Sequence, residues 1–270
     1  MKKSLIRNIL TVVTASIVLS PISMAETVVE TSTADTFSTV ELVALAGRQR
    51  MLSQRIAKDY MYAGNGISAS KANRQMNESL DEFKNALNKL NNAINDEEIK
   101  NLLEFVQMSS DEFEEMTKDE YSSDGAALIL DLSESMLEGS QYVVTSLRNV
   151  LNVNASKIVD DSGRQLMLAQ RIAKYYISYQ SGIKDKNTVR QMNEAVKLFS
   201  DTHNELMLNK TNTPEINIML NDINRLWKIV NKFYLSIEKG GLPLIVFNTT
   251  DKIAKKMSKV TNLYIDINKK

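Results

Sequence analysis

Residues 48–58 read RQRMLSQRIAK, and 116 positions later residues 164–174 read RQLMLAQRIAK. The register also holds outside this motif, because RQMNE at residues 74–78 reappears unchanged at residues 190–194. The two copies align without an insertion or a deletion, so the chain is a tandem duplication. Its most similar segments are rich in Arg and Gln instead of being purely apolar, which indicates a site as well as a core.

The repeat divides the chain into unit one, residues 37–152, and unit two, residues 153–270, each close to the size of an ordinary domain. Residues 1–25 combine a basic start, a short apolar run and small residues before the end, which is typical of a cleavable signal peptide. We expect cleavage after Ala25, a linker over residues 26–36, and a periplasmic or secreted product. An uncleaved membrane anchor is the alternative.

Composition excludes several classes of function. Without the three basic residues of the predicted signal peptide, the chain has 30 Lys and Arg against 33 Asp and Glu, so nucleic acid is not an expected partner. The sequence has no Cys, which excludes disulfides, thiolate metal sites and covalent haem attachment. We therefore expect no cofactor and no metal, and a hydrophobic core that holds the protein together.

That core is predicted to be all-α, because the 270 residues contain only three Pro and nine Gly and apolar residues recur at helical spacing. Helices are expected near residues 37–63, 71–92, 96–118 and 124–151, with four matching helices in unit two. Asp96 and Thr213 are the predicted N-terminal caps of matching helices. Short connections between long helices indicate two tandem antiparallel four-helix bundles.

The junction between the units has two interpretations. Residues 128–178 contain no Pro, so the last helix of unit one can continue into unit two and stack the bundles end to end. The alternative is a break at residues 152–154 that folds the bundles side by side. The sequence favours the continuous helix, since Asn lowers helix propensity only modestly.

The first helix separates into two faces on a helical wheel. Leu52, Ile56 and Tyr60 belong to the face that forms the core of its own bundle, whereas the opposite face combines Gly47 with polar residues and would let another helix approach closely. The candidate ligand-binding residues of the two motif copies are Gly47, Arg48, Arg50, Met51, Gln54, Arg55, Arg164, Gln170 and Arg171. A guanidinium suits a planar oxyanion because it presents two parallel N–H donors. The alternative is that Arg48, Arg55, Arg164 and Arg171 only pair with acids or pack on the bundle.

This motif resembles those of known sensor families. The pattern Ala46-Gly47-x-x-Arg50-Met51-x-x-x-Arg55 is similar to the P-box of periplasmic sensor domains in nitrate/nitrite sensor kinases. The longer string GRQRMLSQRIAK at residues 47–58 resembles the PilJ-type N-terminal domain of type IV pilus methyl-accepting transducers, and this resemblance covers both units. It implies a periplasmic four-helix sensor bundle. In the nitrate-sensor branch the P-box Arg binds the anion at a two-fold interface between first helices, and Arg50 matches that position.

Unit two departs from this pattern. Leu166 occupies the position of Arg50, and Asp160 and Asp161 precede the motif where unit one has Ala44 and Leu45. Two equivalent Arg residues therefore cannot form an anion site within one chain. Either unit two is a degenerate scaffold, or Arg50 alone serves an asymmetric site, or Arg50 residues from two chains meet in a homodimer.

The sequence offers few other candidates for a metal or catalytic site. The one histidine, His203, cannot build a metal site alone and is expected either on a helix surface or lining the bundle. The sequence shows no nucleophile and base pair, phosphate loop or metal-ligand spacing, so we expect no catalytic residue and no enzyme.

Two functional hypotheses follow. The first is a soluble periplasmic sensor-type protein that binds a small anion, for example nitrate or nitrite. It would act with a membrane receptor, a pilus-associated protein or the chemotaxis machinery, because the sequence has no second membrane span and no output domain. The second is a helical interaction or scaffold module without a small ligand.

Overall fold

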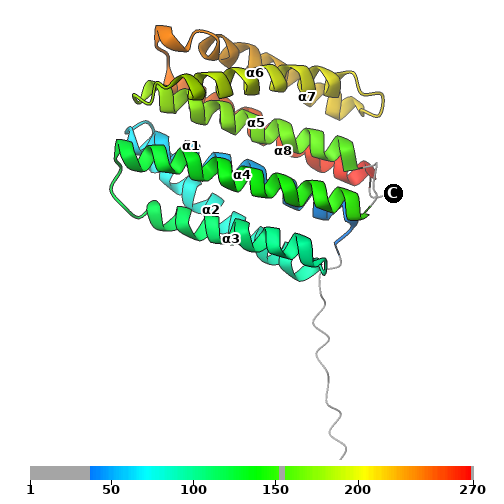
Figure 1. The fold of residues 1–270 in the computed structure, drawn as a ribbon. Helices are drawn as coiled ribbons and strands as arrows, with labels where there is room; N and C mark the ends of the chain where they lie inside the picture. Colours follow the sequence, from blue (N-terminus) through cyan, green and yellow to red (C-terminus); the bar gives the residue numbers. More distant parts are fainter. Residues whose placement is uncertain (1–36, 152–155, 269–270) are drawn as a thin grey trace, which may run out of the picture. The chain divides into compact units, whose positions relative to one another are not determined.

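The computed structural model describes residues 37–151 and 156–268, and these are helical nearly throughout (Figure 1). The predicted signal peptide and the whole of the predicted linker lie outside the described residues. The described part of the chain contains eight α-helices, one short 3-10 helix and no strand, which confirms the all-α prediction. None of these helices is long and apolar enough to span a bilayer.

The helices of unit one follow the predicted segments closely. They are α1 (Thr39–Gly64), α2 (Ala69–Ala93), α3 (Glu97–Met116) and α4 (Ser123–Leu151). Each packs on its neighbours in a closed ring, α1 on α2, α2 on α3, α3 on α4 and α4 on α1, which is the arrangement of a four-helix bundle.

Unit two repeats this order. Its helices are α5 (Ser156–Gln180), α6 (Lys186–Met207), α7 (Pro214–Tyr234) and α8 (Pro243–Asn268), with the 3-10 helix η1 (Ile237–Lys239) before α8. The same ring of contacts joins α5 to α6, α6 to α7, α7 to α8 and α8 to α5. The duplicated sequence therefore folds into two bundles of the same topology.

Local sequence signals set the helix ends. Asp96 caps α3 by accepting from the backbone N–H of Ile99 at 3.0 Å, as predicted. Thr213 caps α7 in the same way and is followed by Pro at the first helical position. Beyond α5, Gly182 has a φ of 109°, a left-handed conformation that suits Gly and helps to end the helix.

The two bundles lie side by side, so the end-to-end stack favoured by the sequence is wrong. The helix α1 packs extensively along α5, and both run in the same direction (Figure 1). The physical reason lies in α1 itself, which buries residues on all its faces, including the motif face. A helix that is buried all round needs neighbours on both sides, and unit two supplies the second side.

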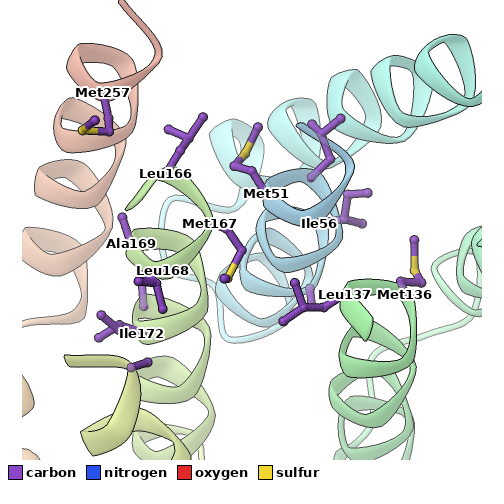
Figure 2. Close-up of a cluster of buried hydrophobic side chains, with 14 of the residues drawn as sticks. Met51, Ile56, Met136, Leu137, Leu166, Met167, Leu168, Ala169, Ile172 and Met257 are labelled. Atoms are coloured by element: carbon purple, nitrogen blue, oxygen red, sulfur yellow. The ribbon is translucent and has the colours of Figure 1, made fainter. Parts of the chain in front are cut away.

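A continuous hydrophobic core runs through both units. Figure 2 shows side chains of α1, α4, α5 and α8 in this core, with Met51 and Met167 near the contact of α1 with α5. These two Met residues occupy matching positions in the motif. The motif copies therefore meet at the centre of the molecule.

Candidate functional site

Arg50 lies fully buried in the contact between the two units. Its Nη1 donates to Gln141 Oε1 at 2.7 Å, and its Nη2 donates to Asp160 Oδ1 of unit two at 2.5 Å. A Cβ atom at Gly47 would lie 3.2 Å from Arg50 Nη2, and one at Gly163 would lie 3.7 Å from it. The two glycines of the repeated motif thus leave space for the guanidinium. The sequence placed Arg50 on the outer face of its own bundle, and unit two covers that face.

Asp160 is the counter-ion of an arginine cluster. Its Oδ2 accepts from Arg148 Nη1 at 3.2 Å and from Arg164 Nη2 at 3.5 Å, in addition to the Arg50 contact. Burial lowers the pKa of Arg50, and the Asp160 charge opposes this shift. An external anion at Arg50 would have to displace a carboxylate that the protein provides. The departures of unit two from the motif are therefore complementary, because Asp160 compensates the charge of the single Arg50.

Lys58, at the end of the motif, makes a second buried contact between the units. Its Nζ lies 3.0 Å from Asp251 Oδ1 on α8 and 3.1 Å from Asp59 Oδ1 on α1. Asp251 also accepts from Lys71 Nζ at 2.6 Å and from Gln75 Nε2 at 3.0 Å. Burial raises the pKa of Asp251, but the Lys58 charge and the hydrogen bonds from Lys71 and Gln75 outweigh it and lower that pKa to about 2. Burial raises the pKa of Asp59 to about 6.

The matching lysine of unit two makes the reciprocal contact. Lys174 Nζ lies 2.5 Å from Glu134 Oε1 on α4, and Arg171 Nη2 lies 2.6 Å from Glu134 Oε2. Burial lowers the pKa of Lys174 to about 8. Burial raises the pKa of Glu134, but Lys174 and Arg171 outweigh it and lower that pKa to about 2. Each motif lysine thus binds an acid on the last helix of the other unit, and Arg171 belongs to this contact.

The motif glutamines show which repeated residues are structural. Gln49 Nε2 donates to the carbonyl oxygen of Phe83 at 2.9 Å, and Gln165 Nε2 donates to that of Phe199 at 3.1 Å, the same contact in each unit. Gln54 Nε2 donates to the carbonyl oxygen of Ser133 at 2.8 Å. These residues satisfy backbone groups inside the bundles.

A cleft of about 690 Å³ lies between α1 and α2 of unit one and α5 and α8 of unit two. Its apolar lining includes Met51 and Leu166, the residue at the position of Arg50. The cations that line it are Arg48, Arg55, Lys71, Lys252, Lys255 and Lys259. Among the described residues of the lining, Asp251 is the one acid. The lining therefore has an excess of positive charge.

The motif arginines of the cleft differ in how they are paired. Arg48 forms an ion pair with Glu82 of α2 and donates to Ser258 Oγ of α8 at 3.4 Å. Arg55 lies 3.6 Å from Asp59, and its Nε has no hydrogen-bond partner in the described part of the protein. Both side chains are partly exposed. They remain able to bind an anion that enters the cleft.

The structure distributes the predicted site residues over several places. Arg48, Met51, Arg55 and Gln170 line the cleft. Arg50 and Arg164 contact Asp160, and Gly47 lies beside the Arg50 guanidinium. Gln54 and Arg171 are held in hydrogen bonds within and between the units. Sequence reasoning missed Lys71 and the three lysines of α8, and it did not assign Asp160 to Arg50.

A signal for the missed lysines was present in the repeat. Lys252, Lys255 and Lys259 recur at helical spacing, and unit one has Met136, Gly139 and Val143 at the matching positions. Their alignment on one face of α8 was therefore readable. That they line a cleft together with residues of α1 was not, because this depends on how the bundles pack.

The described residues include no group of three or more His, Asp or Glu that could hold a metal ion. His203 is buried beside Phe199, with a ring separation of 5.8 Å, and so lines the bundle as expected. Burial lowers its pKa to about 4.

The fold and the cleft define a protein of paired helical bundles with a cationic site between them. Residues 38–123 and 151–239 match the family model described as the N-terminal domain of type IV pili methyl-accepting chemotaxis transducers, PilJ. The chain belongs to this family, and the two segments are consistent with two tandem copies. The family is one of chemoreceptor sensory domains and is not a known enzyme family. No curated protein and no solved structure matches the chain significantly.

Proposed function

We propose that the protein is a periplasmic sensor-type module that binds a small anion in the cleft between its two units and presents the bound state to a membrane receptor of a chemotaxis or pilus system. Family membership supports the sensory role. The single observation that supports anion binding is the charge of the cleft, which has six cationic side chains and one acid among its described lining residues. Such a surface attracts anions and concentrates them locally.

Arg48 and Arg55 are the proposed ligand-binding arginines. Arg50 is the residue that matches the P-box, but its guanidinium is fully buried and paired with Asp160. Replacing a buried counter-ion requires an anion to lose its hydration and to displace a charge that is already well placed. The arginines of the cleft are paired with Glu82 and Asp59 but are more accessible, since their side chains are 31% and 23% exposed.

The second candidate is an interaction module without a ligand. It is favoured by the internal use of the motif, because Gln49, Gln165, Lys58 and Lys174 all hold protein groups. In this hypothesis the repeated motif is needed only to join the two units. Anions would then affect the protein only through ionic strength, and replacing Arg48 and Arg55 would not change that effect.

Thermal unfolding with a panel of sodium salts, including nitrate, nitrite, succinate and citrate at matched ionic strength, tests the proposal. A ligand at about 100 times its Kd stabilises the folded state by about 2.7 kcal/mol, which raises the melting temperature by about 5 to 10 °C in a protein of this size. The double variant Arg48→Gln, Arg55→Gln should lose this shift. The control Arg74→Gln, Arg190→Gln, which changes two exposed arginines outside the cleft, should keep it. An equal shift in both double variants, or no shift with any anion, would favour the interaction module.

A further inference from the structure

The cleft is larger than a three-oxygen anion requires. Its volume of about 690 Å³ lies within the range of sites for organic ligands, about 300 to 1,000 Å³. Its cations come from three helices, with Arg48 and Arg55 on α1, Lys71 on α2 and the lysines on α8. One small anion uses only part of this volume and of these cations.

The lysines of α8 form a row without counter-ions. Lys252, Lys255 and Lys259 lie on one face of α8 and make no ion pair or hydrogen bond with any residue that the structure describes. With a rise of about 1.5 Å per residue, the row extends over about 10 Å. Like charges along one helix face repel each other, and a ligand with several negative groups relieves that repulsion.

Gln170 adds a polar group to the same cleft. Its side chain lines the cleft at 1% residue exposure, and neither its Oε1 nor its Nε2 has a hydrogen-bond partner among the described residues. The matching residue of unit one, Gln54, donates to a backbone carbonyl at 2.8 Å. The amide Nε2 is thus satisfied by the protein in unit one and unsatisfied in unit two, whereas the Oε1 atoms of both Gln54 and Gln170 lack a partner among the described residues. Gln75, also in the lining, has a buried Oε1 without a partner.

We infer that the cleft takes an elongated polyanion that also carries a hydroxyl or N–H donor, such as a hydroxy polycarboxylate, because a row of unpaired lysines and the unpaired amide of Gln170 line one cavity. This inference rests on the proposed anion-binding function. The anionic groups bind the arginines of α1 and the lysines of α8. The donor binds the amide oxygen of Gln170, which otherwise has to be satisfied by water.

Citrate and tricarballylate test this inference, since the two tricarboxylates differ by one hydroxyl group. Titration calorimetry on the full chain at constant ionic strength should show citrate binding about tenfold more tightly, because a hydroxyl that meets a buried polar partner discriminates against the analogue that lacks it. Gln170→Met keeps the side-chain volume. In this variant the affinity for citrate should fall to that for tricarballylate, and the affinity for tricarballylate should be unchanged. Gln107→Met, on α3 and outside the cleft, is the control.

The lysine row has its own test. Lys255→Gln with Lys259→Gln should weaken both tricarboxylates about tenfold and nitrate, which carries a single charge, by a smaller factor. Lys228→Gln on α7 should change none of these affinities. Equal affinity for citrate and tricarballylate in the unchanged protein would overturn the inference, as would binding of nitrate without binding of either tricarboxylate. In both cases the proposed function would stand. If no anion binds, the proposed function itself fails.

Discussion

At the scale of single residues, the buried pair of Arg50 and Asp160 explains the asymmetry of the repeat. Unit one has Arg50 where unit two has Leu166, and unit two has Asp160 where unit one has Ala44. One charge of each sign therefore meets in a fully buried contact between the units. Two arginines at the same place would repel each other in a medium of low dielectric constant.

This pair predicts the effect of removing the acid. Asp160→Asn should lower the free energy of unfolding by about 3 kcal/mol or more, since it leaves the buried Arg50 without a counter-ion. Replacing the pair with Arg50→Met and Asp160→Leu should restore most of the loss, because apolar residues of similar volume need no counter-ion. Chemical denaturation measures both effects.

Asp161 is the matched control for Asp160. It lies next in the sequence and pairs with Lys157, whose side chain is 66% exposed. Asp161→Asn should change the free energy of unfolding by less than about 1 kcal/mol. Equal losses in Asp160→Asn and Asp161→Asn would contradict the role of the buried pair.

At the scale of elements, the start of α8 is positioned by its contact with α5. A Cβ atom at Gly241 would lie 1.6 Å from the hydroxyl oxygen of Tyr176. In unit one, the matching Cβ at Gly125 would lie 3.5 Å from the hydroxyl oxygen of Tyr60. The segment before α8 thus lies against α5 more tightly than its counterpart in unit one. This contact places the start of α8 against α5.

Substitution of these two glycines should therefore have different results. Gly241→Ala should destabilise the protein by about 1–3 kcal/mol, because Tyr176 or the start of α8 must move. Tyr176→Phe in the same chain should recover part of this loss by removing the nearest atom. Gly125→Ala should change the free energy of unfolding by less than about 1 kcal/mol, since the contact of its Cβ with Ser122 Oγ at 3.1 Å offsets the higher helix propensity of Ala. Melting curves of the three variants measure these effects. If Gly241→Ala destabilised the protein no more than Gly125→Ala does, the close contact would be refuted.

At the scale of the whole molecule, the sequence predicted the bundles but not the site. Helix ends such as those at Asp96 and Thr213 depend on local chemistry, which the sequence shows directly. The pairing of Arg50 with Asp160 and the meeting of Arg55 with Lys255 in one cleft depend on how two bundles pack. The repeat revealed that α1 had an outer face for another helix, yet it could not show that this helix was α5 of the same chain.

His203 makes the stability of the whole molecule depend on pH. Its folded-state pKa is lowered by burial from 6.5 to about 4, so the unfolded chain binds the proton more readily between these values. The stabilising contribution is present above about pH 6.5 and is lost as pH falls to 4, by about 3 kcal/mol in total. Asp59, with a pKa raised from 3.8 to about 6, acts in the opposite direction, stabilising at low pH and losing that contribution as pH rises through 6.

His203→Leu separates the two contributions. Unit one has Leu87 at the matching position, also buried, so the repeat itself supplies an apolar residue that fits a bundle interior. The free energy of unfolding of the unchanged protein, relative to that of His203→Leu, should decrease by about 3 kcal/mol between pH 7 and pH 4. Urea denaturation at several pH values measures this difference. A difference that stays constant over this range would mean that the imidazole is not shielded from protons in the folded bundle. Asp59 contributes equally to both proteins, so its effect cancels in the difference. If the two free energies of unfolding are similar at neutral pH, the variant should be more stable than the unchanged protein at pH 4.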